Sequence, residues 1–407
     1  MKLIQILGHN SNWNIESHLE QNIGDEFLIA AFTFGSHYQE NKRLLPILSK
    51  SMIDMQFYGQ KKSADLSKGK LSDFDFHPAN FAADDEPTNV VITNCIQKAI
   101  AYQEANGFSK IIIPHYYEDN DVEAIISIIK CVNAYLKCNK HDGKEYYMTL
   151  PLANDIIRNN EKIDKLLLEL TDMHIVFDGY FIACENKPEQ GHKLSVDDKL
   201  MNNLSKVLRI LRAQSFKTIY AYANWDALFY LAQTDIDYIT IGTYENLRNF
   251  SIKRFVEDIS GGASEGYYFS EKLLNVIRAK DLVNIRHNGM LPLIKNDRNV
   301  FSNIILDVDY KWNIHKPDVN KNYLLAISRL LKEISEIEDI RDRTLRVLAL
   351  IKQAQDRYQI LNDNYVVLQS EGRNYHLDKW MMYLLRTIQM KPAEFFVWYD
   401  ANYPNDK

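Results

Sequence analysis

The sequence lacks the features that mark membrane-spanning, secreted and strongly basic proteins. No run of about 18 apolar residues occurs, so we expect no transmembrane helix and no membrane partner. The N-terminal apolar stretch is broken by Gly8, His9 and Asn10 and is too short for a secretory signal. Lys and Arg number 48 against 54 Asp and Glu, and this net charge of −6 argues against a globally basic nucleic-acid binder.

Cysteine is also scarce, and no CxxC pair occurs among Cys95, Cys131, Cys138 and Cys184. We therefore expect four reduced thiols in a cytoplasmic protein. No HxH pair or HExxH motif is present, and a zinc site would need a tighter cluster of Cys and His. We expect no metal and no other cofactor; a metal site built from scattered His and Asp is the alternative.

The composition that remains is that of a folded protein, with 46% hydrophobic and 25% charged residues. Eight short apolar runs alternate with helical patterns, which is typical of buried parallel strands joined by amphipathic helices. The runs span residues 27–34, 52–59, 110–114, 146–151, 174–183, 217–224, 237–242 and 266–269. Eight such strands predict a (β/α)8 TIM-barrel-like domain. A doubly wound sheet is the rival, but no GxGxxG or P-loop motif follows the first run.

The chain of 407 residues is long enough for two domains. We expect the barrel over residues 1–295, with an irregular loop or lid at about 60–90, and an all-α domain over 296–407. Apolar stripes at 320–340, 343–361 and 377–388 predict three helices there. These stripes indicate packing within the chain or, alternatively, a homo-oligomer or protein partner bound through residues 320–390.

Two basic segments, at 61–70 and 341–357, leave nucleic-acid contact open as a further hypothesis. The first contains Lys61, Lys62, Lys68 and Lys70, and the second contains Arg341, Arg343, Arg346, Lys352 and Arg357.

Barrel active sites lie at the carboxyl ends of the strands, so the residues after each run are the site candidates. We expect Asp178, Glu185 and Glu245 to be catalytic, since glycosidic bond chemistry needs two facing carboxyl groups. Substrate-binding candidates at the same ends are His37, His115, Tyr180, Asn224, Trp225, Tyr244 and Arg248. Schiff-base chemistry is disfavoured because Lys110 and Lys217 lie at strand starts. The loop at 261–266, GGASEG, is acidic and is expected to be a plain connection or, less favoured, an anion cradle.

Residues 178–250 resemble the second half of the tRNA-guanine transglycosylase barrel. The likeness rests on Asp178-Gly-Tyr-Phe-Ile, on the strand Ile236-Asp237-Tyr238-Ile239-Thr240 and on the turn Glu245-Asn246-Leu247-Arg248. It implies a barrel, but the base-exchange activity of that family does not carry over to this chain, because three of the family's features are replaced or missing. Thr240 stands where the family carries its nucleophilic Asp, Ala183-Cys184-Glu185 replaces its glycine pair, and its zinc signature is absent.

Two functions follow as hypotheses. The first is a hydrolase or glycosyl-transfer enzyme that acts at a glycosidic or N-glycosidic bond of a sugar, nucleotide or nucleic-acid substrate. The second is a catalytically silent barrel that acts as a scaffold or subunit of a larger assembly through its helical C-terminal part.

Overall fold

The computed structural model describes residues 1–59, 69–80, 88–256, 266–313 and 315–404. The chain divides into two compact units, which we treat separately. Unit 1 comprises Met1–Lys187, Asp197–Ala223 and Ile236–Ser260, and unit 2 comprises Pro188–Val196, Asn224–Asp235 and Gly261–Lys407. Where we expected one boundary at 295, the chain changes unit after Ser260, and two shorter segments of the barrel region belong to unit 2.

Unit 1 is a nearly closed (β/α)8 barrel. Its eight described strands run in parallel in the order β3-β2-β1-β8-β7-β6-β5-β4. The two edge strands, β3 and β4, pack against each other and so nearly close the barrel. Helices cover the outside of the ring and side chains fill the inside, which is why the strands are apolar on both faces. The strands are β1 (Lys2–Leu7), β2 (Glu26–Ala30), β3 (Ser51–Asp54), β4 (Lys110–Ile113), β5 (Glu145–Leu152), β6 (Gly179–Cys184), β7 (Lys217–Ala221) and β8 (Tyr238–Gly242).

The barrel closes through a strand that the sequence analysis did not assign. Lys2–Leu7 pairs in parallel with both β2 and β8, with Ile4 opposite Thr240. Residues 266–269, which we expected to be the eighth strand, instead form part of β9 (Tyr267–Ser270) in unit 2, where they pair antiparallel with β10 (Asn275–Arg278). The fold class is thus as predicted, but the barrel includes Lys2–Leu7 as a strand in place of the expected strand at 266–269.

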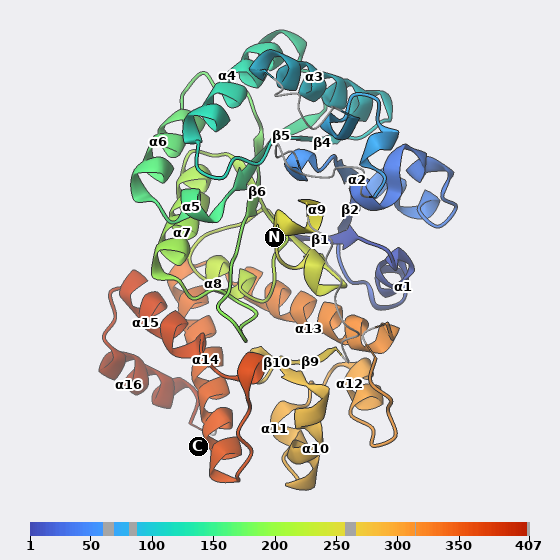
Figure 1. The fold of residues 1–407 in the computed structure, drawn as a ribbon. Helices are drawn as coiled ribbons and strands as arrows, with labels where there is room; N and C mark the ends of the chain where they lie inside the picture. Colours follow the sequence, from blue (N-terminus) through green and yellow to red (C-terminus); the bar gives the residue numbers. More distant parts are fainter. Residues whose placement is uncertain (60–68, 81–87, 257–265, 314, 405–407) are drawn as a thin grey trace. The chain divides into compact units, whose positions relative to one another are not determined.

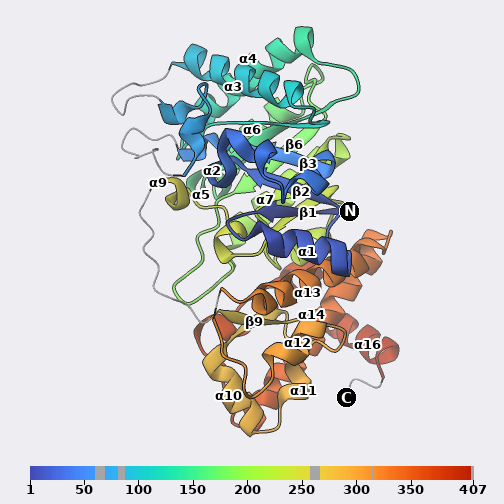
Figure 2. The ribbon, with the colours of Figure 1, turned by 90° about the vertical axis from the view of Figure 1, so that its right-hand side faces the viewer.

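The helices of unit 1 begin where the sequence supplies a cap. Asp121 accepts hydrogen bonds from the backbone N–H groups of Glu123 and Ala124 at the start of α4, and Asn159 and Asp197 do the same for α6 and α7. In Figure 1, α3 to α7 lie outside strands β4 to β6, and in Figure 2 α1 runs alongside β1. The helices are α1 (Ser11–Gln21), α2 (Ala31–Phe34), α3 (Asn89–Ala105), α4 (Val122–Asn139), α5 (Asn154–Ile157), α6 (Asn160–Leu170), α7 (Asp198–Ala213) and α9 (Lys253–Val256).

Unit 2 is mostly helical and is built on the β9–β10 hairpin, against which α13 packs. Its core includes the rings of Trp225, Phe269 and Trp380, all buried. The helices are α8 (Ala227–Leu231), α10 (Ala279–His287), α11 (Leu291–Ile294), α12 (Val300–Ile305), α13 (Pro317–Ser335), α14 (Ile340–Asp363), α15 (Leu377–Thr387) and α16 (Pro392–Asn402).

The apolar stripes of α13, α14 and α15 are covered within the chain: Leu324, Ile327, Leu348 and Leu384 are fully buried. The basic residues of α14 are also engaged locally. Arg343 is buried and pairs with Asp235, Arg346 pairs with Glu333, and Lys352 pairs with Asp356. These contacts explain the basic character of α14 through packing within unit 2. In the other basic segment, Lys61, Lys62 and Lys68 lie outside the described residues.

Of the expected lid at 60–90, the structure describes residues 69–80 and 88–90, which include two short 3-10 turns, Leu71–Asp73 and Pro78–Asn80. Within the described ranges, no helix is long and apolar enough to cross a bilayer.

Candidate active site at the carboxyl ends of the barrel strands

Two buried carboxyl groups lie at the carboxyl ends of barrel strands. Asp54 is the last residue of β3, and Glu185 directly follows β6; their exposed fractions are 1% and 0%. A buried carboxyl group is costly unless other groups satisfy it, so its partners show what the site is built to do.

Asp54 is held by hydroxyl and backbone donors. The hydroxyl of Tyr222, just after β7, donates to Oδ2 at 2.8 Å, and the hydroxyl of Tyr58 lies 3.2 Å from both carboxyl oxygens. The backbone N–H of Gln56 donates to Oδ1 at 2.9 Å. Burial raises the pKa of Asp54 to about 6, although these donors and the positive charge of Arg254 act to lower it. A carboxyl group with this pKa exchanges its proton near neutral pH, as a general acid or base requires.

The backbone around Asp54 is held in a strained conformation. Gln56 and Tyr222 both lie in the left-handed region, with φ of 53° and 55°, and neither is glycine. Their side chains meet, because Gln56 Nε2 donates to the Tyr222 hydroxyl at 2.9 Å. Further bonds hold each residue in place: Gln56 Oε1 accepts from the N–H of Phe32, and the N–H of Tyr222 donates to Thr240 Oγ1. Such residues cost about 1–3 kcal/mol each and concentrate at functional sites.

Glu185 has one satisfied oxygen and one open oxygen. Oε2 accepts from the Tyr117 hydroxyl at 2.7 Å and from the N–H of Asn154 at 3.1 Å, and it pairs with Lys187 at 3.1 Å. Oε1 is buried and has no hydrogen-bond partner. A buried acceptor without a partner is uncommon, and it marks the atom that a substrate could engage.

Aromatic rings fill the space between the two carboxyl groups. The Phe250 ring lies 4.9 Å from that of Tyr58, 5.6 Å from that of Tyr222 and 6.2 Å from that of Tyr117. Phe250 therefore separates the tyrosines that bind Asp54 from the tyrosine that binds Glu185. Burial raises the pKa of Tyr58, Tyr117 and Tyr222 well above the ordinary range, so these hydroxyls remain donors.

Comparisons with known proteins do not assign this site. No family model matches the chain, and neither does a curated protein. Among solved structures, the chain is similar to the glycoside hydrolase family 30 subfamily 8 xylanase Xyn30A from Clostridium acetobutylicum. That similarity has 10% identity and a TM-score of 0.31 and covers 63% of this chain and 67% of the other. A similarity this weak carries no argument, and the barrel rests on its own strand order.

Of the three predicted catalytic carboxylates, the structure places Glu185 in this site. Asp178 precedes β6 instead of following it, so it lies at the opposite end of the strand. There it accepts from the N–H of Tyr146 at 2.7 Å and pairs with Lys140 at 3.0 Å. Glu245 lies beyond the end of β8, in the turn Glu245–Leu247, and is half-buried.

Two predicted binding residues follow β8. Tyr244 accepts a hydrogen bond from Asn10, which follows β1, and packs 5.7 Å from the Trp13 ring. Arg248, which we expected to bind an anionic group, is buried and donates to the carbonyl oxygens of Gly242 and Thr243. Its charge therefore stabilises the end of β8.

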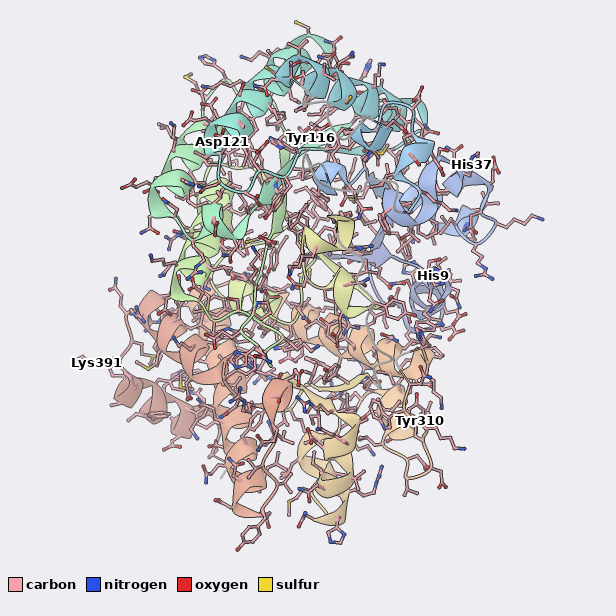
Figure 3. The ribbon with its side chains drawn as sticks, viewed as in Figure 1. His9, His37, Tyr116, Asp121, Tyr310 and Lys391 are labelled. Carbon is pink, nitrogen blue, oxygen red and sulfur yellow. The ribbon has the colours of Figure 1, made fainter. Side chains whose placement is uncertain are left out.

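Three others have structural partners away from the site. His37 is exposed on the segment Gly35–Glu40, where it pairs with Glu40, and Figure 3 shows it at the periphery. His115 is fully buried, and burial lowers its pKa; its ring nitrogens lie next to the carbonyl oxygens of Tyr116 and Ile125. The Tyr180 hydroxyl donates to the carbonyl of Leu170.

Asn224 and Trp225, the remaining two, belong to unit 2. The Tyr323 hydroxyl donates to Asn224 Oδ1 at 2.7 Å, and the Trp225 ring packs 5.6 Å from that of Phe269. The loop at 261–266 falls outside the described residues apart from Gly266. Among the described ranges, no group of three or more His, Cys, Asp or Glu is placed to hold a metal ion.

Sequence reasoning missed Asp54, Tyr58, Tyr117 and Tyr222. Asp54 was hidden because the apolar run appeared to continue to Gly59, whereas β3 ends at Asp54 and the chain turns at Gln56. Tyr222 was likewise read as part of a strand that ends one residue earlier. An acid inside an apolar run was the available signal, since a buried strand rarely contains an unpaired carboxylate.

Proposed function

We propose that unit 1 is an enzyme that acts at a glycosidic or N-glycosidic bond by carboxylate acid/base chemistry. The observation that carries this proposal is the pair of buried carboxyl groups at the carboxyl ends of β3 and β6. One has its pKa raised to about 6, and the other has an open oxygen. Two carboxyl groups in different environments are the arrangement that this chemistry uses.

The different environments of the two carboxyl groups suit them to different roles in the reaction. Asp54 gives its proton to the leaving oxygen or nitrogen as the bond to the anomeric carbon breaks, and Tyr58 and Tyr222 stabilise the carboxylate that results. Glu185 offers Oε1 to the anomeric carbon, or to the proton of the attacking water, while Tyr117 and Asn154 orient it through Oε2. Water as the acceptor gives a hydrolase, and a substrate hydroxyl or base gives a glycosyl transferase.

The resemblance to the tRNA-guanine transglycosylase barrel does not carry base exchange to this chain, because the family's nucleophilic Asp is replaced by a threonine. At the position of that family's nucleophile, Thr240 is fully buried, and its Oγ1 accepts from the N–H of Tyr222. Through this hydrogen bond, Thr240 stabilises the backbone of Tyr222. In the proposed reaction, the group that acts on the anomeric carbon or on the attacking water is therefore the carboxylate of Glu185 and not Thr240.

The test is turnover of two substrate sets by purified full-length protein: chromogenic aryl glycosides, and nucleosides or tRNA assayed for base release and base exchange. Glu185→Gln keeps the side-chain shape and the acceptor oxygen, and we expect it to reduce turnover by about 10³-fold. Glu189→Gln, at an exposed carboxylate four residues later, is the control and should keep full activity. Equal turnover by wild type and Glu185→Gln would remove Glu185 from the mechanism.

One observation favours the catalytically silent barrel instead. Tyr58, Tyr117, Tyr222 and Phe250 are each at most 4% exposed and fill the space between the carboxyl groups. If neither substrate set is turned over, the next measurement is native mass spectrometry of full-length protein and of a chain truncated after residue 319. A change of assembly state on truncation would support the scaffold function.

A further inference from the structure

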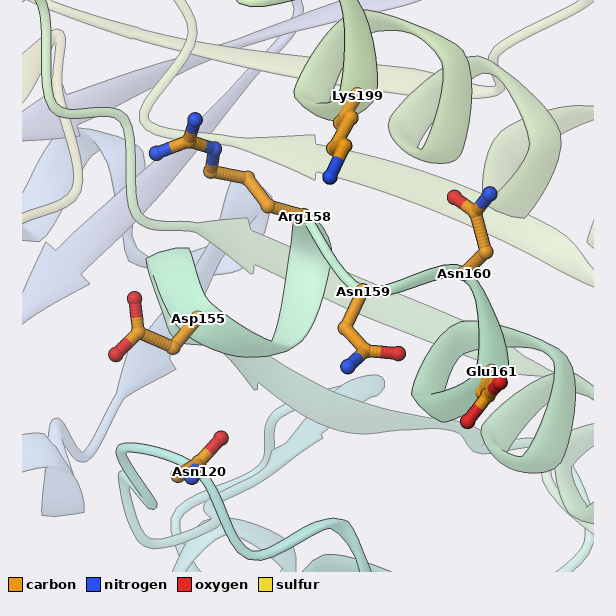
Figure 4. A pocket seen from close by; sticks show the side chains of 7 residues that line it. All are labelled: Asn120, Asp155, Arg158, Asn159, Asn160, Glu161 and Lys199. Carbon is orange, nitrogen blue, oxygen red and sulfur yellow. The ribbon is translucent and has the colours of Figure 1, made fainter.

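A polar cavity of about 560 Å³ opens on unit 1 among the loops that follow β4, β5 and β6. Figure 4 shows the side chains that line it, which come from three places in the chain: Asn120 after β4, Asp155, Arg158, Asn159, Asn160 and Glu161 after β5, and Lys199 at the start of α7. Every residue that lines it is polar or charged. The size is within the ordinary range for a small-molecule site.

The cavity adjoins the contacts of Glu185 through two of its own loops. Asn154, whose N–H holds Glu185 Oε2, immediately precedes Asp155. Tyr117, whose hydroxyl binds the same oxygen, lies three residues before Asn120. The loops that position the catalytic carboxylate therefore also line the cavity.

Hydrogen bonds from residues of α6 and α7 fix the wall of the cavity. Lys162 on α6 donates to the carbonyl oxygen of Asn120 at 2.7 Å and also to its side-chain oxygen, which ties the first loop to α6. Asn203 on α7 donates to Asn160 Oδ1 at 3.0 Å and to the carbonyl oxygen of Ile157 at 2.7 Å. A site held in this way loses little conformational entropy when it binds a ligand.

The charges in the cavity do not suit an anion. Arg158 is already paired with Asp197 at 2.8 Å, and the other cation, Lys199, lines the cavity together with two carboxylates, Asp155 and Glu161. Among the described residues, Asp155, Glu161 and Lys199 have no hydrogen-bond or ion-pair partner, so each is available to a ligand. A phosphate group would meet at least as much negative as positive charge. Sugar hydroxyls, in contrast, donate to carboxylates and accept from ammonium and amide N–H groups.

We propose that this cavity is a subsite for a neutral, polyhydroxylated sugar unit of the substrate. The inference rests on the proposed function and narrows it: the substrate is a neutral oligosaccharide, not a nucleic acid. Asp155 and Glu161 accept from hydroxyls of the bound unit, and Lys199 donates to them. The adjoining unit would then be presented to Glu185.

The experiment measures binding to full-length protein by saturation-transfer NMR, followed by titration. The neutral probes are cellotriose, maltotriose and xylotriose, and the anionic probes are inorganic phosphate and pentauridylate RNA. We expect at least one trisaccharide to bind and neither anion to compete with it. Asp155→Asn and Lys199→Met should each weaken that trisaccharide about tenfold, because each removes a hydrogen bond to a charged group.

Matched controls lie outside the cavity, one on α6 and one on α7. Asp164 on α6 and Lys206 on α7 pair with each other at the surface, so Asp164→Asn and Lys206→Met should leave trisaccharide binding unchanged. Three outcomes would each overturn the subsite: no binding of any trisaccharide, binding that Asp155→Asn and Lys199→Met leave unaltered, or binding of phosphate that depends on Lys199.

The experiment distinguishes a failure of the proposed subsite from a failure of the proposed enzymatic function. The trisaccharide should bind Asp54→Asn as well as it binds wild type, since Asp54 does not line the cavity. Trisaccharide binding at Asp155 without turnover of any glycoside would reject the proposed enzyme and keep the subsite. Turnover that depends on Glu185 without trisaccharide binding would keep the enzyme and reject the subsite.

Discussion

The two ends of the barrel treat their carboxylates differently. At the amino end, three aspartates each precede a strand and accept the N–H of the second residue of the neighbouring strand. Asp25 holds Leu3, Asp178 holds Tyr146 and Asp237 holds Thr218, at 2.7, 2.7 and 2.8 Å. Cations support two of them: Lys140 pairs with Asp178, and Arg212 pairs with Asp237.

At the carboxyl end, tyrosine hydroxyls take the place that cations hold at the amino end. Tyr58 and Tyr222 bind Asp54, and Tyr117 binds Glu185. Lys187, which pairs with Glu185, is half-exposed, and Arg254 acts on Asp54 through its charge. Because no cation bonds Asp54 directly, burial raises its pKa to about 6, and this group can gain and lose a proton near neutral pH. The difference separates the end whose aspartates join neighbouring strands from the end where we place the proposed chemistry.

The largest expected effect comes from the same substitution made at both ends. Asp54→Asn should reduce turnover by about 10³-fold, because it removes the exchangeable proton and keeps the shape. Asp178→Asn should leave turnover within about twofold of wild type. Steady-state kinetics on the substrate identified in the screen provide the measurement, and comparable losses from both variants would erase the distinction between the ends.

The next effect is a dependence of stability on pH. Because the pKa of Asp54 is about 6 in the folded protein and about 3.9 in an unfolded chain, the folded state binds this proton more tightly. Its contribution to stability is therefore present below about pH 4 and is lost as pH rises through about 6, by about 3 kcal/mol in all.

Urea unfolding of wild type and Asp54→Asn over this pH range isolates that contribution, because other groups titrate equally in both proteins. The wild type should lose about 3 kcal/mol relative to the variant between about pH 3 and about pH 7. A difference between the two proteins that stays constant with pH would mean that Asp54 titrates normally.

A smaller effect is expected at the amino end. Asp178→Ala should lower the free energy of unfolding by about 2 kcal/mol, because the N–H of Tyr146 loses its acceptor. Asp178→Asn keeps an acceptor oxygen and should cost less. Thermal unfolding of both variants measures this, and an unchanged midpoint for Asp178→Ala would show that the aspartate does not stabilise the strand pair.

The smallest effect compares two partners of Glu185. Tyr117→Phe removes a buried donor at 2.7 Å and should lower the free energy of unfolding by about 1–3 kcal/mol. Lys187→Met removes a cation whose side chain is 54% exposed and should change it by less than about 1 kcal/mol. The reverse order, seen by urea unfolding, would indicate that Glu185 depends on a cation after all.

The sequence was informative about the barrel and less so about its site, for physical reasons. Apolar runs between amphipathic helices depend on burial, which composition records, so the fold class was predictable. We assigned the wrong segment as the eighth strand. Lys2–Leu7 pairs with β8, and this contact joins the first and last strands of the barrel, so no local pattern in the sequence indicates it.

The site depended on where each strand ends, to within one or two residues. Reading β6 as starting at His174 moved Asp178 to the wrong end, and reading β3 as continuing to Gly59 hid Asp54. Glu185 follows its strand, as expected, because β6 ends within one residue of the end of the apolar run; its proposed catalytic role stays a prediction. The tyrosine hydroxyls that bind the carboxyl groups, such as that of Tyr117, come from loops distant in the sequence, and no local pattern predicts them.

The three aspartates at the amino end also bear on the order in which the barrel assembles. Each bond joins consecutive strands, β1 with β2, β5 with β6 and β7 with β8, across 19 to 32 residues of chain. Short-range closures of this kind form early, because little chain entropy is lost. The barrel can therefore grow from three pre-joined strand pairs, with the seam between β3 and β4, which lacks such a bond in the described chain, as the last part to close.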